Sequence, residues 1–168
     1  MLTQIDDVVV IALGSNLANG YASSRDLLEA ALERLKLPGL TLLARSRWWR
    51  SAAWPPSSHP DYLNGLTIVE TALTPHAALE ALRDIESQFG RVRHHPNDAR
   101  TLDLDLIAHG RTVIDSPDLV LPHPRAAERL FVMGPLAEIA PGWRHPVLGR
   151  TAAQLAAVAI VGADATPI

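Results

Sequence analysis

The sequence predicts an α+β fold in which an antiparallel sheet carries helices packed on one face. Apolar strand-like runs and helix-like periodicities follow one another in the order strand, helix, strand, strand, helix, strand. That order is the split βαβ arrangement of ferredoxin-like sheets. The chain also shows no internal repeat or linker-like stretch. We therefore expect one domain over residues 1–168, with short helices in a C-terminal extension.

The first strand and helix are predicted from apolar patterning. Residues 8–13 form a continuous β-branched apolar run, which is typical of a buried strand. Apolar residues then recur at helical spacing from Leu27 to Leu35. Ser23 and Asp26 stand before them at the spacing of a capping box, so the helix should begin there.

The middle of the chain predicts two strands and a second helix. Residues 40–49 and 62–71 each have strand-like composition, and an irregular proline-rich loop separates them. Thr74 and Pro75 suit the N-cap and first turn of a helix, and Gly90 suits its end. The second helix should therefore occupy most of the interval between these residues.

The last predicted strand is the segment "RTLDLDLI", residues 100–107, in which leucines alternate with two aspartates. A turn at the following "HGR" should return a short strand over residues 112–114. Short helices are expected near residues 132–138 and 151–159.

Composition narrows the classes of function. The chain has 168 residues, 48% of them hydrophobic, no cysteine and a net charge of −3. The absence of cysteine excludes disulfides and thiolate chemistry, and the negative charge argues against nucleic acid or an anionic membrane as a partner. The first residues lack the basic start of a secretory signal. We expect a cytoplasmic monomer that acts on small molecules.

Asp103 and Asp105 are the first candidate site. A strand places both carboxylates on one face, roughly 7 Å apart, where like charges repel by roughly 2 kcal/mol at an effective dielectric of about 20. Arg91, Arg93 and Arg100 precede them. Carboxylates beside arginines suit Mg²⁺ and polyphosphate. The alternative is a structural network of arginines and aspartates.

Two further segments carry candidate binding residues. His123 lies between two prolines and is followed by Arg129 and Phe131. These suit a nucleotide, although a lone histidine and a lone phenylalanine are more often structural. Tyr62 and Asn64 share a strand face, and an aromatic ring beside an amide suits a planar heterocycle. An ordinary strand with a satisfied asparagine is equally compatible.

Taken in order, the strings "ALGSNL", "PDYLNG", "IESQFGRVR", "RTLDLDLI" and "LPHPRAAERLFVMGPLAEIAP" resemble the 6-hydroxymethyl-7,8-dihydropterin pyrophosphokinase family of folate biosynthesis. The resemblance extends over residues 8–150. It implies a ferredoxin-like fold and an ATP-dependent transferase that moves pyrophosphate to the pterin's hydroxymethyl oxygen and releases AMP.

The resemblance also implies roles for individual residues. Asp103 and Asp105 would hold two Mg²⁺ ions, and together with Arg91 and Arg100 they form the expected catalytic group. The residues expected to bind ATP are Glu86, Arg93, Arg100, Leu106, His123 and Arg129. The residues expected at the pterin are Ser51, Trp54, Tyr62, Asn64 and Phe131.

The chain departs from the family pattern in two loops. Some members have a Thr-Pro-Pro-x-Gly stretch where this chain has residues 51–55, and Trp54 is a candidate to cover the pterin there. In the second loop, His94 stands where some relatives carry lysine. Two other functions remain open: a non-catalytic ferredoxin-like ligand-binding module, and another Mg²⁺-dependent phosphate enzyme. Pterin-dependent release of AMP distinguishes the pyrophosphokinase from both.

Overall fold

The structure is a computed structural model that describes residues 4–36, 39–52, 60–90 and 101–168. Its strands are β1 (Val9–Ser15), β2 (Leu40–Arg45), β3 (Trp49–Ser51), β4 (Tyr62–Thr71), β5 (Asp103–His109), β6 (Ile114–Ser116), β7 (Leu119–Leu121) and β8 (Thr166–Pro167). Its helices are α1 (Ser24–Leu35), α2 (Pro75–Gln88), α3 (Leu130–Ile139) and α4 (Ala152–Val158), with 3₁₀ turns at Ile5–Asp7 and Ala126–Glu128.

The main sheet has the predicted ferredoxin-like order. Its strands run β5-β1-β4-β3-β8, and β2 also pairs with β4 next to β3. The pairings of β1 with β4 and β5, and of β4 with β2 and β3, are all antiparallel. The α+β prediction is therefore confirmed, and the short strand β8 is an addition at the β3 edge.

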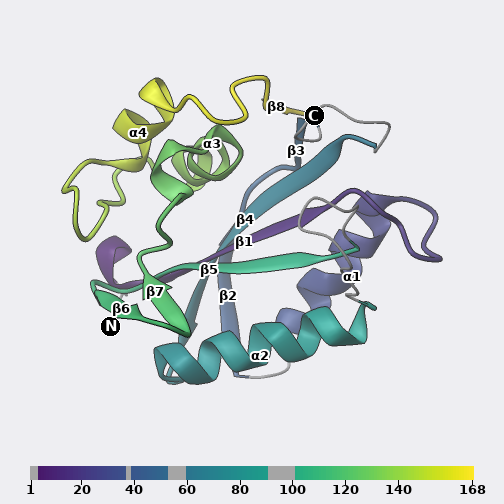
Figure 1. Ribbon diagram of the computed structural model, residues 1–168, viewed down its shortest axis with the longest axis horizontal. Coiled ribbons are helices and arrows are strands. Elements are labelled where there is room, and N and C mark those ends of the chain that lie inside the picture. The colour runs from purple at the N-terminus through teal and green to yellow at the C-terminus, as the bar shows by residue number, and fades with distance from the viewer. Residues whose placement is uncertain (1–3, 37–38, 53–59, 91–100) are drawn as a thin grey trace.

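The helices cover both faces of this sheet (Figure 1). Helices α1 and α2 pack on one face over a core that includes Ile11, Leu13 and Leu104. The short helices of the extension, α3 and α4, pack on the other face over a second core that includes Val10 and Leu66. Because the sheet is sandwiched in this way, all seven residues of β1 are buried.

Both major helices begin at the predicted caps. The Ser23 side chain accepts a hydrogen bond from the Asp26 N–H at 3.1 Å, and that of Thr74 accepts one from the Ala77 N–H at 3.2 Å. Gly90, just after α2, has φ +75, a backbone angle that favours glycine. The sequence alone predicts where these helices begin, because a free backbone N–H in the first turn is bonded by a side chain only three residues away.

The predicted strand over residues 40–49 is wrong as one element, since it is divided into β2 and β3. At the break, the Ser46 N–H donates to the Leu66 carbonyl at 2.9 Å, while the Ser46 Oγ accepts from the Leu66 N–H at 2.9 Å. Trp48 then packs over Gly65, where an added Cβ would lie 2.4 Å from its ring. A side-chain oxygen thus replaces a backbone carbonyl and ends the regular ladder.

The segment 112–114 also differs from its prediction. The turn is present, with the Thr112 N–H donating to the His109 carbonyl at 3.1 Å. Ile114, however, begins β6 and pairs with Leu121 of β7 in a separate two-stranded sheet. Strand β5 consequently stays at the edge of the main sheet.

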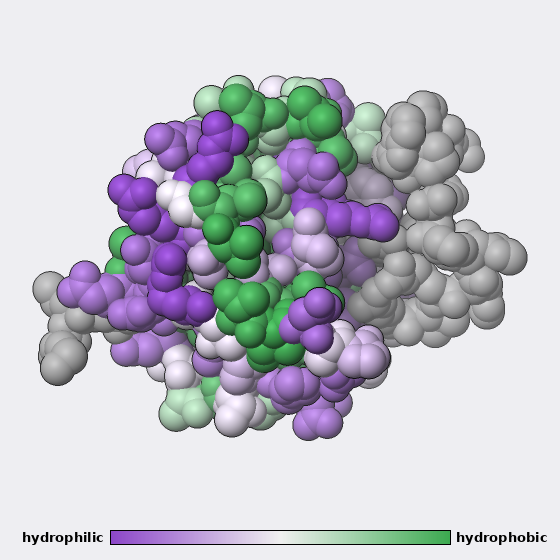
Figure 2. Space-filling view, turned by 60° about the vertical axis from the view of Figure 1, so that its left-hand side comes forward, coloured by the Kyte–Doolittle hydropathy of each residue, from purple (hydrophilic) through white to green (hydrophobic). Residues whose placement is uncertain are grey.

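The C-terminal extension and the β6–β7 hairpin also carry exposed apolar residues. Figure 2 shows hydrophobic residues in a band between polar ones on the side where α4 and this hairpin lie. The large apolar side chains exposed there include Val113, Val120, Val147, Leu148, Val158, Ile160 and Val161. Within the part of the chain that is described, no helix is both long and apolar enough to cross a membrane.

Candidate active site

Two rows of residues cross the sheet where the predicted site residues lie. Asn64 of β4 pairs with Gly14 of β1, and Gly14 pairs in turn with Asp103 of β5. The next row on the same face contains Leu66, Ala12 and Asp105. Directly paired residues in antiparallel strands point to the same face, and neighbouring strands are about 4.8 Å apart. Asn64 and Asp103 therefore share the α3/α4 face about 10 Å apart across Gly14.

The leucines between the two aspartates hold β5 in this orientation. Leu102, Leu104 and Leu106 are at most 4% exposed, whereas Asp103 and Asp105 are half-buried on the opposite face. The buried carboxylate of Glu86 on α2 accepts a hydrogen bond from the Leu104 N–H at 3.0 Å. Glu86 thus contacts the backbone between the two aspartates at the sheet edge.

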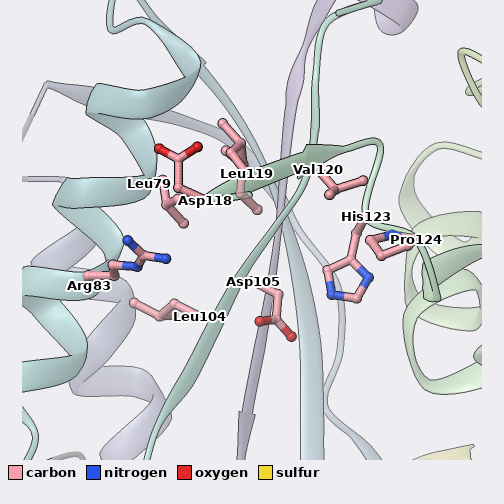
Figure 3. Close-up of a pocket in the computed structure, with 10 residues that line it drawn as sticks. Leu79, Arg83, Leu104, Asp105, Asp118, Leu119, Val120, His123 and Pro124 are labelled. Carbon is pink, nitrogen blue, oxygen red and sulfur yellow. The ribbon is translucent and has the colours of Figure 1, made fainter. Parts of the chain in front are cut away.

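Asp105 also lines a hollow of about 220 Å³ at the outer edge of β5. Figure 3 shows residues of α2, β5 and β7 around it, with Asp105 and His123 on neighbouring segments. The backbone of His123 is tied to β5, because its N–H donates to the Ile107 carbonyl at 2.8 Å. Several lining residues were not predicted from the sequence, namely Leu79, Arg83, Asp118, Leu119 and Val120.

The environment of His123 favours its neutral form. Burial lowers the pKa of His123 below its ordinary value, and the positive charges of Arg129 and Arg125 act in the same direction, against the opposing effect of Asp105. The Arg125 N–H donates to His123 Nδ1 at 3.2 Å. In the neutral ring Nε2 therefore carries the proton, so His123 can donate a hydrogen bond from that atom.

Ser51, Tyr62 and Asn64, three of the predicted pterin residues, lie together on β3 and β4, at the other end of the first row. Asn64 Nδ2 donates to the Ser51 Oγ at 3.0 Å, and both residues are buried. Tyr62 pairs with Ser51 across β4 and β3. Phe131, at the start of α3, is half-buried against the core on this face, and the Arg129 guanidinium lies 5.6 Å from its ring centroid.

Gly14, near the end of β1, was not predicted as a site residue. An added Cβ on Gly14 would lie 3.1 Å from the Asn64 Oδ1. A side chain there would also project between Asn64 and Asp103, since all three share one row and one face. With glycine at this position, no side chain stands between Asn64 and Asp103. The sequence signal of Gly14 was its position directly after the apolar run over residues 8–13.

Four predicted site residues lie outside the described residues: Trp54, Arg91, Arg93 and Arg100. Within the described ranges, no group of three or more histidine, aspartate or glutamate side chains is gathered closely enough to enclose a metal ion. Asp103 and Asp105 are a pair of carboxylates, which suits a cation that shares its coordination with a substrate.

Comparison with known proteins identifies the family of this chain. Residues 10–141 match the family model described as 7,8-dihydro-6-hydroxymethylpterin-pyrophosphokinase (HPPK). A Synechocystis 2-amino-4-hydroxy-6-hydroxymethyldihydropteridine pyrophosphokinase is 41% identical over 147 residues, which cover 87% of this chain and 73% of that protein. The protein of the same name from Pseudomonas aeruginosa is 40% identical over 82% of this chain and 83% of its own length.

Solved structures show the same fold. Wild-type Plasmodium falciparum HPPK-DHPS has a TM-score of 0.70 at 13% identity, with 89% of this chain covered. This chain spans 44% of that chain and 19% of the Pneumocystis carinii folic acid synthesis protein fol1, to which it is 36% identical over 144 residues. The resemblance inferred from the ordered motifs is confirmed, and the chain belongs to the 7,8-dihydro-6-hydroxymethylpterin-pyrophosphokinase family.

Proposed function

We propose that this chain transfers pyrophosphate from ATP to the hydroxymethyl group of 6-hydroxymethyl-7,8-dihydropterin. The hydroxymethyl oxygen forms a bond to the β-phosphorus, the bridging bond between the α- and β-phosphates breaks, AMP leaves, and the hydroxyl proton passes to solvent. The observation that carries this proposal is the row of Asn64, Gly14 and Asp103. It places an amide suited to a heterocycle and a carboxylate suited to a phosphate-bound cation on one face, about 10 Å apart.

Asp103 and Asp105 fit the Mg²⁺ ions of such a reaction. Both carboxylates project from one face of β5, and Mg²⁺ in phosphate-transfer sites is commonly held by one or two carboxylates together with phosphate oxygens. When bound, Mg²⁺ neutralises phosphate charge that would otherwise repel the nucleophile. We infer two ions held by the two carboxylates together, as the family resemblance implies.

The remaining residues bind and orient the two substrates. We assign the nucleotide to the β5 edge, where His123 Nε2–H donates to it and Arg129 supplies positive charge; Glu86 and Leu106 support this side. Asn64 and Ser51 would bind the edge of the pterin, and Tyr62 and Phe131 would cover its faces. We keep the roles that the resemblance implies for four further residues, Arg91, Arg93, Arg100 and Trp54.

Phosphoryl transfer of this kind depends on positioning and charge more than on a strong base. This suits a site whose described residues are an amide, aromatic rings, carboxylates and a neutral histidine. We propose in addition that residues 1–168 act as one pyrophosphokinase domain, as a monomer in the cytoplasm. The small size of both substrates is compatible with a single-chain site.

The proposal is tested by incubating the protein with ATP, the reduced hydroxymethylpterin and Mg²⁺, and quantifying adenine nucleotides. We expect one AMP for each pterin consumed, no AMP above background without pterin, and loss of AMP release when EDTA is added. Release of ADP, or ATP breakdown independent of the pterin, would contradict the proposal. A melting curve with EDTA is the control, and it should match the curve without EDTA because β5 is held by leucines and Glu86.

A further inference from the structure

The C-terminal segment, residues 160–167, runs along the predicted pterin end of the site. It lies outside residues 10–141, the part of the chain that matches the family model. The Val161 N–H donates to the Glu128 carbonyl, and the Leu130 N–H donates to the Val161 carbonyl, both at 2.9 Å. These bonds fix the segment on either side of Arg129, at the start of α3.

Within this segment, Gly162 lies directly against Phe131. An added Cβ at Gly162 would lie 2.4 Å from Cδ1 and 2.9 Å from Cε1 of the Phe131 ring. Such separations do not occur between real atoms, so any side chain at this position would displace the ring. Gly162 also has φ +66, and the Ala165 N–H donates to its carbonyl at 2.9 Å, which closes a tight turn.

The same turn reaches the other side of the pterin end through Asp164. Asp164 Oδ2 accepts a hydrogen bond from the Ala52 N–H at 2.7 Å, across 112 residues of sequence. Ala52 directly follows Ser51, whose hydroxyl accepts from Asn64. Ala165 is 4% exposed and β8 pairs with β3, so the turn that carries Gly162 and Asp164 is anchored on both sides.

We propose that Gly162 and Asp164 are positioning residues for the pterin: Gly162 sets the place of the Phe131 ring, and Asp164 holds the backbone next to Ser51 and Asn64. This inference rests on the proposed function. A planar heterocycle gains from an aromatic face only when the ring stands at contact distance. Changes at Gly162 and Asp164 should therefore raise the KM for the pterin more than the KM for ATP, although Arg129, which is assigned to ATP, also lies against Phe131.

The first test compares Gly162→Ala with Gly149→Ala. Gly149 has φ +70, and an added Cβ there would meet nothing within 4 Å, so this control carries the same backbone strain without a ring contact. We expect Gly162→Ala to raise the KM for the pterin by about three- to tenfold, the range of one aromatic contact. In Gly162→Ala the KM for ATP should change less than the KM for the pterin. Gly149→Ala should keep both KM values at those of the parent, and its melting temperature should fall by less because it displaces no ring.

Removing the ring provides a second control. In a Phe131→Leu background, Gly162→Ala should raise the pterin KM no further, because the aromatic ring whose place it changes is absent. An equal additional increase in that background would show that Gly162 acts by another route and would overturn its assigned role.

Asp164 is tested separately, since it does not depend on a glycine conformation. Asp164→Ala should raise the pterin KM by about threefold, the range of one exposed hydrogen bond. Asp164→Asn retains an oxygen that can accept from Ala52 and should restore the KM to that of the parent. Should Gly162→Ala fail to fold, this pair decides the inference, since equal pterin KM values for parent and Asp164→Ala would overturn it.

Failure of this inference is distinguishable from failure of the proposed function. A parent protein that releases AMP while all these variants keep its pterin KM overturns the positioning role alone. A parent protein that releases no pterin-dependent AMP overturns the proposed function and this inference together.

Discussion

Two parts of the surface combine acids with arginines around a hollow, yet they differ in how the charges are arranged. One is the β5 edge with Asp105 and His123, beside a hollow of about 220 Å³. The other lies beside β2 and α1, where Arg25, Arg45 and Arg47 border a hollow of about 290 Å³. The larger hollow is not the predicted site, so size alone does not identify function.

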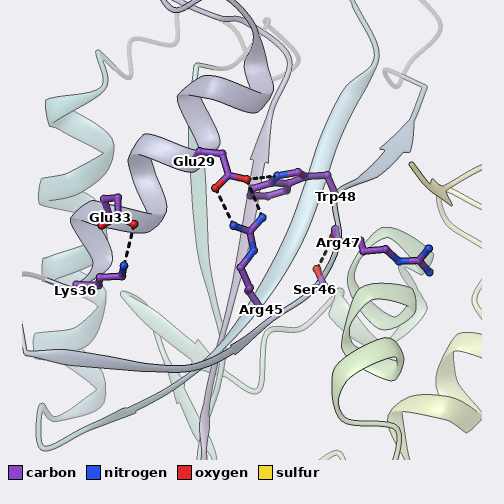
Figure 4. Close-up of polar contacts among 7 residues, drawn as sticks. All are labelled: Glu29, Glu33, Lys36, Arg45, Ser46, Arg47 and Trp48. Atoms are coloured by element: carbon purple, nitrogen blue, oxygen red, sulfur yellow. Dashed lines mark hydrogen bonds and ion pairs between the residues drawn. The ribbon is translucent and has the colours of Figure 1, made fainter.

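In the second region the opposite charges are closely matched. Both side-chain oxygens of Glu29 accept hydrogen bonds from Arg45, at 2.8 and 2.9 Å, and one also accepts from the Trp48 Nε1–H at 2.9 Å (Figure 4). The Arg45 guanidinium stands 5.0 Å from the centroid of the Trp48 ring. The Arg45 hydrogen bonds are the largest cause that lowers the pKa of Glu29, to about 2. This arrangement joins α1 to the sheet and serves stability.

On β5 the backbone imposes the opposite arrangement. Asp103 and Asp105 are two residues apart on one strand, so pleating places like charges on one face. Glu29, by contrast, takes its cation from a different element. The two regions therefore differ in geometry: Glu29 is bonded by side chains of another part of the chain, whereas one strand aligns two carboxylates, the arrangement that we propose for a cation bound together with phosphate.

The largest effect should come from the aligned acids. Asp103→Ala or Asp105→Ala should lower kcat for AMP release by about 10³-fold or more, because charge neutralisation at the phosphates is lost. Both variants should stay folded, which a melting curve checks, because β5 is held by the buried Leu102, Leu104 and Leu106 and by the hydrogen bond of Glu86 to the Leu104 N–H. Asp115→Ala, on the exposed face of β6, is the matched control and should keep the parent rate. A rate within tenfold of the parent for both site variants would break the comparison.

A smaller effect, on stability only, should follow from Glu29→Gln. Since Glu29 is 43% exposed, screening reduces the value of its pairing, and we expect a loss of about 1 kcal/mol of unfolding free energy. Rates of AMP release should be unchanged. Glu33→Gln, at the more exposed end of α1, is the matched control, and its unfolding free energy should stay close to that of the parent.

The same variant provides a pH test, measured by urea denaturation at several pH values. The pKa of Glu29 is lowered from 4.5 to about 2 in the folded protein. The stabilisation from Glu29 is therefore fully present above pH 4.5 and is lost as the pH falls through 2. The difference in stability between parent and Glu29→Gln should shrink across that window, and a constant difference would contradict the pairing.

The smallest effect should come from Arg45→Lys, which keeps the charge but loses the two-pronged contact with Glu29. We expect a loss of about 0.5 kcal/mol of unfolding free energy and an unchanged rate of AMP release. In the Glu29→Gln background the substitution should cost less, which a double-mutant cycle measures. A fall in AMP release for this variant would assign the second region to catalysis.

The pattern of residues along the chain was enough to locate most of the main elements and the two aspartates that share one face of β5. Residues 62–71 form a strand as predicted, and Thr74 begins its helix, because strand alternation and helix caps depend on near neighbours in sequence. The common face of Asp103 and Asp105 followed from backbone geometry alone. The ordered motifs then identified the family, which the match over residues 10–141 confirms.

Other features were decided only by the tertiary structure. Three of these features depend on segments that are far apart in the chain. They are the break at Ser46, the position of Gly14 between Asn64 and Asp103, and the contact of Gly162 with Phe131. Local periodicity determines which face a side chain takes, but which segment packs against that face depends on how all elements fill the two cores together. For that reason the sequence by itself determined β1, β4 and β5, the starts of α1 and α2 and the acidic pair, whereas packing decided where residues 40–51 break and what surrounds the acids.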